Sequence, residues 1–260
     1  MSSASFRQLT QIKGLKVGFY IGEFMTPGIG QIIHAAGCEF AMLDMEHSGF
    51  GYETVKRTLR YLHDAGVASI LRPPSQAYHH VARACDVGAQ GVMPPMLSTA
   101  DEARRILDAM KYVPEGKRGV ALGIAHDDYR AGSVDQKLRL ANEKTSLVAL
   151  IETAQGVAEA EAIAAVDGVD CLWIGHFDLT CSLGIPGQFD HPDFVAAVER
   201  IVAAAKGEGK SLGRLVTSVE EGAALHAQGF DMIIYGSDIH ILRTGLANGV
   251  EGLRRECKPR

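Results

Sequence analysis

The stretch FAMLDMEHSGFGYETVKRTLRYLHDAGVASILR, residues 40–72, contains a strand, a helix and a second strand in succession. It opens with the short apolar run FAMLDM and closes with ASILR, and apolar side chains recur at helical spacing across YETVKRTLRYLHDAG between them. A glycine ends the helical part, as is common at helix C-termini. A strand, a helix and another buried strand form the repeating unit of a parallel α/β protein.

The same alternation continues along the whole chain. Eight apolar runs are predicted to be strands: LKVGFYI, FAMLDM, ASILR, GVMPP, SLVALIE, DCLWIG, SLGRLV and DMIIYG. Eight parallel strands close a TIM-type barrel, and 260 residues is a typical length for one. We therefore predict an α/β fold, a (β/α)8 TIM barrel that forms a single domain over residues 1–260, with a short N-terminal helix and a C-terminal helical extension. An open, doubly wound sheet is the alternative.

Composition narrows the classes of function. The formal net charge is −5 and the pI is near 6.1, which disfavours a nucleic-acid partner. No apolar run reaches the roughly 18 residues that a membrane span requires, and the opening MSSASFRQLTQIK lacks the apolar core of a secretory signal. These features predict a cytoplasmic protein without a membrane partner. The five cysteines have no CxxC spacing, so neither a zinc site nor a disulfide framework is expected.

Polar side chains follow several of the predicted strands. They are Asp44, Glu46 and His47 after the second strand, Arg72 after the third, Glu152 after the fifth and Asp178 after the sixth. In a parallel barrel these positions meet at one face, where the chemistry of such barrels is found. Each residue alone is weak evidence, because a Glu-His pair is commonly a surface feature and Arg72 could simply pair with a neighbouring carboxylate. Their shared location favours a functional site.

Two of these acids suit a metal ion. Glu152 and Asp178 lie at the ends of adjacent strands, without a cysteine or an obvious histidine partner. Two such carboxylates favour a hard divalent cation such as magnesium or manganese. The alternative is structural. Glu152 would then start a helix favourably, and Asp178 would cap the helical segment LTCSLG.

The motifs LDMEHSGFGYETV, LRPP, CDVGAQGVMPPML, YVPEGKRGV, LIET and GVDCLWIGHFDLTCSLGIPGQFDHP occur in this order. Together they resemble the HpcH/HpaI family of metal-dependent pyruvate aldolases over residues 15–245. The resemblance implies a (β/α)8 barrel, a divalent cation (Mg, Mn or Co) held by Glu152 and Asp178, and an arginine, Arg72, at the keto oxygen of a 2-oxo acid. It also implies a homo-oligomer, often a hexamer.

The resemblance assigns four further residues. It implies that His47 acts as the base, often through water, with Asp86 orienting it, and that backbone N–H groups around Gly175 and Phe177 bind the substrate carboxylate. This sequence departs from the family pattern at His176 and Phe177, where GPAD or GPTD turns are usual. It also has Leu150 where relatives often have glutamine. We expect these differences to alter the aldehyde and to leave the pyruvate half unchanged.

A further departure from the family pattern lies between residues 117 and 145. The segment RGVALGIAHDDYRAG is too polar and rich in glycine for a strand, and we interpret it as an active-site loop that precedes the helix QKLRLANEK. Within it, His126, Asp127 and Asp128 could reach the site, although a solvated loop edge is the favoured interpretation.

The predicted function is reversible cleavage of a 4-hydroxy-2-oxo acid to pyruvate, or a related 2-oxo acid, and an aldehyde, through a metal-stabilised enolate. A Schiff-base mechanism would need a lysine at a strand end, and none of the eight runs ends in one. The alternatives are a citrate-lyase-like or malyl-CoA-type carbon–carbon lyase, and a non-catalytic barrel that binds a 2-oxo acid.

Overall fold

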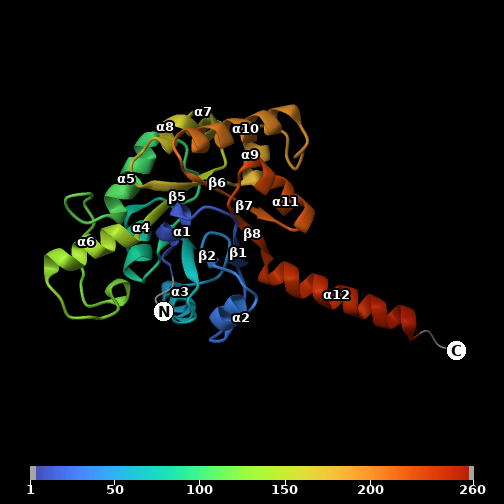
Figure 1. Cartoon of the computed structure of the whole chain (residues 1–260), viewed down its shortest axis with the longest axis horizontal. Coiled ribbons are helices and arrows are strands. Elements are labelled where there is room, and N and C mark those ends of the chain that lie inside the picture. Colours follow the sequence, from blue (N-terminus) through green and yellow to red (C-terminus); the bar gives the residue numbers. More distant parts are fainter. Residues whose placement is uncertain (1–3, 258–260) are drawn as a thin grey trace.

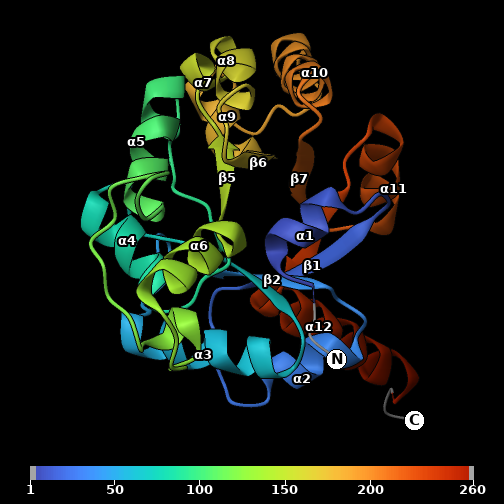
Figure 2. The ribbon, with the colours of Figure 1, turned by 60° about the vertical axis from the view of Figure 1, so that its left-hand side comes forward.

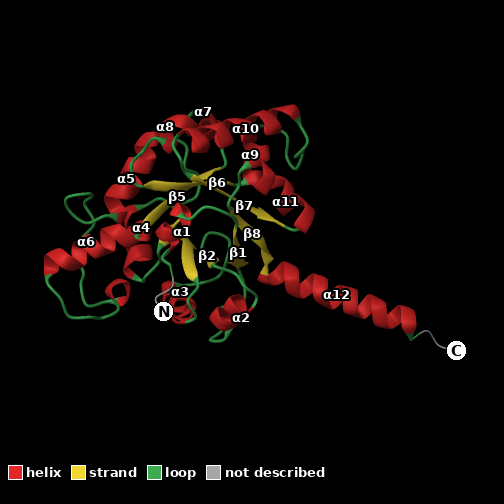
Figure 3. Cartoon of the chain, in the orientation of Figure 1, coloured by secondary structure: helices red, strands yellow, loops and turns green. Residues whose placement is uncertain are grey.

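The computed structural model describes residues 4–257, and its strands form one closed parallel barrel in the order β1 to β8 (Figure 1 and Figure 3). The strands are β1 Lys16–Ile21, β2 Phe40–Asp44, β3 Ala68–Arg72, β4 Gly91–Val92, β5 Ser146–Ile151, β6 Val169–Ile174, β7 Ser211–Val216 and β8 Met232–Ser237. The predicted barrel and all eight predicted strands are confirmed, and the open-sheet alternative is wrong. Strand β4 is short because Pro94 and Pro95, which follow it closely, have no N–H for the ladder.

The strands alternate with helices, most of which pack around the barrel (Figure 2). They are α1 Phe6–Gln11, α2 Ile29–Ala35, α3 Tyr52–Asp64, α4 Tyr78–Asp86, α5 Ala100–Met110, α6 Val134–Lys144, α7 Ala154–Ala158, α8 Ala160–Ala164, α9 His176–Ser182, α10 Pro192–Gly207, α11 Val219–Gln228 and α12 Asp238–Glu256, with a 3-10 turn η1 at Ala125–Asp127. Serine or threonine side chains cap several of them, as Thr99 does for α5. Within residues 4–257 no helix combines the length and apolarity that crossing a bilayer requires.

Two hydrophobic cores result from the alternation of side chains along each strand. One lies between the barrel and its helices. The other fills the barrel interior, where Phe40 packs edge-on against Trp173 at a ring-centroid distance of 6.4 Å. Helix α1 contributes Phe6 to this inner core, with a centroid distance of 5.9 Å to Phe40. Trp173 is thus a residue of the inner core.

The same alternation explains how polar groups come to line the barrel at its far end. In β2, Phe40 and Met42 point inward, so the next inward position is Asp44. Ala68 and Ile70 likewise direct Arg72 inward, and Val148 and Leu150 direct Glu152 inward. The strands therefore stack apolar layers below and place charged groups in the layer that meets the strand-to-helix loops.

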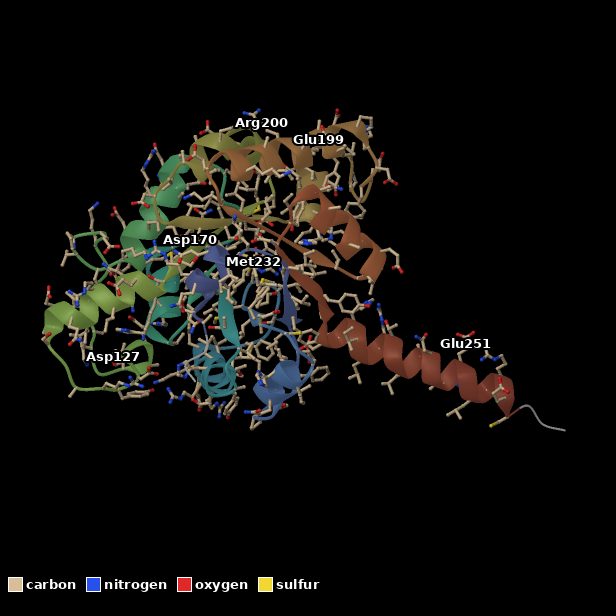
Figure 4. All side chains as sticks on the ribbon, viewed as in Figure 1. Asp127, Asp170, Glu199, Arg200, Met232 and Glu251 are labelled. Atoms are coloured by element: carbon tan, nitrogen blue, oxygen red, sulfur yellow. The ribbon has the colours of Figure 1, made fainter. Side chains whose placement is uncertain are left out.

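The segment before α6 does not form the expected active-site loop within this subunit. It connects a helix to a strand and packs outside the barrel helices, where Asp128 pairs with Arg60 of α3 at 2.9 Å and Ala125 lies near Gly88, just after α4. Figure 4 shows Asp127 at the periphery, well separated from Met232 of the barrel strand β8. The solvated interpretation is also wrong for Asp127, because it forms a largely buried ion pair with Lys137 at 2.7 Å.

The tight interior predicts a large difference between two glycine substitutions. A Cβ added to Gly213 in β7 would overlap the Trp173 ring, whereas a Cβ at Gly207 in α10 meets nothing within 4 Å. We expect Gly213→Ala to lower the free energy of unfolding by about 1–3 kcal/mol, as overpacked cores do. Gly207→Ala should change it little or raise it by about 0.4–1 kcal/mol. Urea unfolding followed by circular dichroism measures both, and equal midpoints would contradict the predicted strain.

Candidate active site

An ion pair between β2 and β3 organises the centre of the site. Asp44 is fully buried, and its Oδ1 accepts a hydrogen bond from Arg72 Nε at 2.7 Å. Its Oδ2 accepts a second from the Tyr20 hydroxyl of β1 at 2.6 Å. Burial alone would raise the pKa of Asp44, but the hydrogen bond and charge of Arg72 lower it below its usual range. Asp44 is therefore a fixed anion that orients the guanidinium.

The loop after β2 adds two more polar groups around this pair. The backbone N–H groups of Glu46 and His47 donate to the Asp44 carboxylate at 3.0 and 3.2 Å. The Glu46 carboxylate then faces Arg72 Nη1 at 3.3 Å and His47 Nε2 at 3.6 Å. The side chain of His47 is 61% exposed, so it faces solvent and can exchange protons with it. The alternative that Arg72 pairs with a neighbouring carboxylate is thus confirmed, and this pairing presents the arginine at the strand ends.

Glu152 continues the inward-facing row of β5. It is 2% exposed, and its Oε1 accepts a hydrogen bond from the Met96 N–H at 2.6 Å. Burial raises the pKa of Glu152 to about 7, the Met96 bond opposes the shift, and the charges of Asp178 and Glu46 add to it. Gly175 makes room for this side chain, since a Cβ there would lie 2.8 Å from the Glu152 Cβ. The protein alone therefore offers little positive charge to offset the buried Glu152 carboxylate.

Asp178 approaches Glu152 from the first turn of α9. That helix begins at His176 with Gly175 as its N-cap, so Asp178 does not cap LTCSLG as the structural alternative had it. No cluster of three or more His, Cys, Asp or Glu side chains within metal-ligating reach occurs in residues 4–257. A magnesium-type cation commonly takes one or two carboxylates and completes its shell with water and substrate oxygens. Two neighbouring carboxylates, one of them buried and underbalanced, fit such an ion.

Asp86 and the Gly175 N–H are engaged with other partners than the ones expected. Asp86 ends α4, which runs back from the strand ends, and it binds Arg118. Among the described residues no hydrogen bond or ion pair joins Asp86 to His47, so the fold does not bring them together within one subunit. The Gly175 N–H donates to the Ile151 carbonyl at 3.2 Å and is used by the sheet. Phe177 lies in the first turn of α9, where helix N–H groups lack partners within the helix.

Sequence reasoning missed Tyr20 and Met96 and gave Asp44 no role. Tyr20 shares the inward face of β1 with Gly18, so strand alternation could have placed it in the polar layer. Met96 acts through its backbone and has φ of 60°, for which a sequence gives no signal in a non-glycine residue.

Several known proteins are similar to this chain. The chain is 34% identical over 233 residues to a pyruvate aldolase of Rhizobium etli, covering 88% of this chain and 89% of that protein. It is 32% identical over 246 residues to a hydroxypyruvate/pyruvate aldolase of Delftia acidovorans, covering 94% and 89%. An HpcH/HpaI aldolase from Desulfitobacterium hafniense DCB-2 has a crystal structure with a TM-score of 0.89 at 29% identity, covering 96% and 97%. The family model described as HpcH/HpaI aldolase/citrate lyase matches residues 18–244. The chain therefore belongs to the HpcH/HpaI aldolase/citrate lyase family.

Proposed function

We propose that the protein is a metal-dependent aldolase that reversibly cleaves a 4-hydroxy-2-oxo acid to pyruvate, or a related 2-oxo acid, and an aldehyde. The observation that carries the proposal is the polar layer at the strand ends, where Arg72 is clamped by Asp44 beside the acids Glu152 and Asp178. The two relatives named as pyruvate aldolases support the same chemistry.

Glu152 and Asp178 would hold the divalent cation (Mg, Mn or Co), which supplies Lewis-acid polarisation of a ketone oxygen when bound. Arg72 Nε and Nη1 face Asp44 and Glu46, which leaves the N–H bonds of Nη2 to donate to the keto oxygen of the substrate. A fixed cationic donor stabilises the negative charge that develops on this oxygen. The Phe177 N–H would donate to the substrate carboxylate.

His47 would carry the proton. An exposed imidazole in this loop can take the proton of the C4 hydroxyl, directly or through water, as the C3–C4 bond breaks. Returning a proton to C3 then gives pyruvate. The Glu46 carboxylate, 3.6 Å from His47 Nε2, stabilises the protonated ring between these two transfers.

The experiment that tests this proposal follows pyruvate alone in D2O by NMR. With magnesium or manganese present, the methyl protons should exchange for deuterium, because enolisation requires no aldehyde. A chelator should stop the exchange and added metal should restore it. Binding of pyruvate without exchange would instead identify a non-catalytic 2-oxo acid-binding barrel, and exchange at full rate in metal-free protein would contradict the metal dependence.

The proposal includes a homo-oligomer, because α12 leaves the barrel and projects away from it (Figure 1). Of the residues Asp238–Glu256 that form this helix, only Asp238 is buried. One face of α12 carries an exposed apolar stripe at helical spacing, formed by Ile239, Leu242, Leu246, Val250 and Leu253. The place on β8 and β1 that an eighth barrel helix would cover is an apolar hollow of about 410 Å³, lined by residues such as Val17, Val219 and Ile233. The α12 of a second copy would fill it.

If α12 is exchanged between subunits in this way, a single charge on its apolar stripe should weaken assembly. Leu246 is 59% exposed, and Leu246→Glu would bury a carboxylate against apolar side chains in the oligomer. Sedimentation velocity at micromolar concentration should show an oligomer for the wild type and a shift to smaller species for this variant. Asn248→Glu, on another face of the same helix, is the matched control and should leave the profile unchanged. A wild type that sediments as a monomer would contradict the exchange of α12 between subunits.

The role expected of Asp86 also depends on assembly. Since Asp86 and His47 do not meet within one subunit, Asp86 would orient His47 only if a second copy brings it to the strand-end face. We propose that role for the oligomer alone. Asp86→Asn should then lower the rate of proton transfer in the oligomer, and the Leu246→Glu variant should show the same loss without any change at Asp86.

A further inference from the structure

Among the described residues of one subunit, the strand-end face has few cationic side chains. Arg72 is the only lysine or arginine in the last positions of the strands, the loops that follow them and the first turns of the next helices. Arg214 reaches this face from within β7, where it is paired with Glu221 at 3.2 Å. Arg72 is already engaged by Asp44 and Glu46. The carboxylates of this face are more numerous and include Glu23, Asp44, Glu46, Glu152, Asp178 and Asp238. The face is therefore strongly acidic, and a divalent cation would offset only part of its charge.

Exposed apolar side chains lie on the loops and first helical turns that follow the strands. Phe24, Met96 and Phe177 are 38%, 51% and 63% exposed. Two of them are tied to the proposed metal site: the Met96 N–H donates to Glu152, and Phe177 directly precedes Asp178 in α9. Phe24 is held by its N–H, which donates to the buried Asp238 at 2.8 Å. These contacts fix the backbones from which the three apolar side chains extend at the strand-end face.

On the basis of the proposed aldolase activity, we propose that the aldehyde is uncharged and carries an aliphatic or aromatic substituent, and that an aldehyde with its own carboxylate is selected against. The cation and Arg72 would both be engaged in binding pyruvate. A second carboxylate on the aldehyde would then lie among acids and apolar side chains, and the described lysines and arginines of this face are already paired. An Asp86 supplied by a second copy would bring Arg118 already paired to it. An alkyl or aryl chain would instead bury apolar surface against Phe24, Met96 and Phe177.

A matched pair of four-carbon aldehydes tests the inference. Butanal and 4-oxobutanoate differ by the terminal carboxylate, and each is added to pyruvate by the metal-loaded enzyme while product formation is measured. We expect kcat/KM for butanal to exceed that for 4-oxobutanoate by at least about tenfold, since placing like charges together opposes binding. Equal values, or a preference for 4-oxobutanoate, would overturn the inference.

A charge introduced at the strand-end face should reverse the preference. Phe177→Lys supplies a cation beside the aldehyde, and Phe177→Gln removes the ring without adding charge. The ratio of the two kcat/KM values should move toward 4-oxobutanoate by about tenfold in the lysine variant relative to the glutamine variant. An unchanged ratio would show that charge at this face does not select the aldehyde.

Exchange of the pyruvate methyl protons is recorded for each protein as a separate readout. If exchange occurs and the charged aldehyde is preferred, the inference about the aldehyde fails and the aldolase proposal stands. If exchange is absent from the metal-loaded wild type, the aldolase proposal fails and the inference falls with it.

Discussion

Glu152→Gln should lower kcat/KM for cleavage of a 4-hydroxy-2-oxo acid by at least about a thousandfold, because Lewis-acid stabilisation contributes several kcal/mol. Glutamine keeps the size of the side chain and can still accept the Met96 N–H, so the loss would report the missing carboxylate charge. The same variant should bind manganese much more weakly, which isothermal titration calorimetry measures independently of activity.

The fold should survive this change. Glu152 is buried beside Asp178 and Glu46, and a neutral amide removes repulsion among them. The melting temperature of the metal-free variant should therefore equal or exceed that of the metal-free wild type, while the rise in melting temperature on adding metal should be lost. Glu161→Gln is the control, because Glu161 forms an exposed ion pair with Arg200 and should affect neither readout. Retention of a tenth or more of the activity by Glu152→Gln would exclude Glu152 as a metal ligand.

The sequence predicts the barrel well because each βα unit repeats the same pattern. It also places the charged residues in one layer, since Asp44, Arg72 and Glu152 each follow two inward-facing apolar residues of their strands. Alternation along a strand is a local property, and it is legible without the fold.

What the sequence does not predict depends on contacts between distant segments. The segment that contains Asp127 has the polar composition of an active-site loop, and only its packing on α3 and α4 shows that it lies elsewhere. Composition cannot distinguish these two positions, because both are polar and rich in glycine. The Gly175 N–H, similarly, is committed to Ile151 by the pairing of β5 with β6, which no motif records.

Arg72→Met should abolish cleavage and also destabilise the protein, and the two effects can be separated. Asp44 is fully buried, so removing its cation leaves an uncompensated charge that costs about 3–5 kcal/mol. In the wild type Arg72 holds the pKa of Asp44 low against burial, so the stabilisation is present above the ordinary aspartate range and is lost as pH falls through the lowered value. Without Arg72, burial raises the pKa of Asp44, and the variant should recover stability relative to the wild type as the pH is lowered. Urea midpoints at several pH values measure this.

The double variant Asp44→Asn/Arg72→Met separates structure from chemistry. Removing both charges should restore most of the stability lost in Arg72→Met, because the buried site is again neutral overall. Activity should stay at least about a hundredfold below the wild type, since no cationic donor remains for the developing oxyanion. The stability of Arg72→Lys should lie between those of Arg72→Met and the wild type. The variant should remain nearly inactive, because an ammonium group cannot contact Asp44 and Glu46 as a fork while donating to a substrate. Recovery of cleavage in the double variant would mean that Arg72 serves only to neutralise Asp44, and the proposed contact with the keto oxygen would then be wrong.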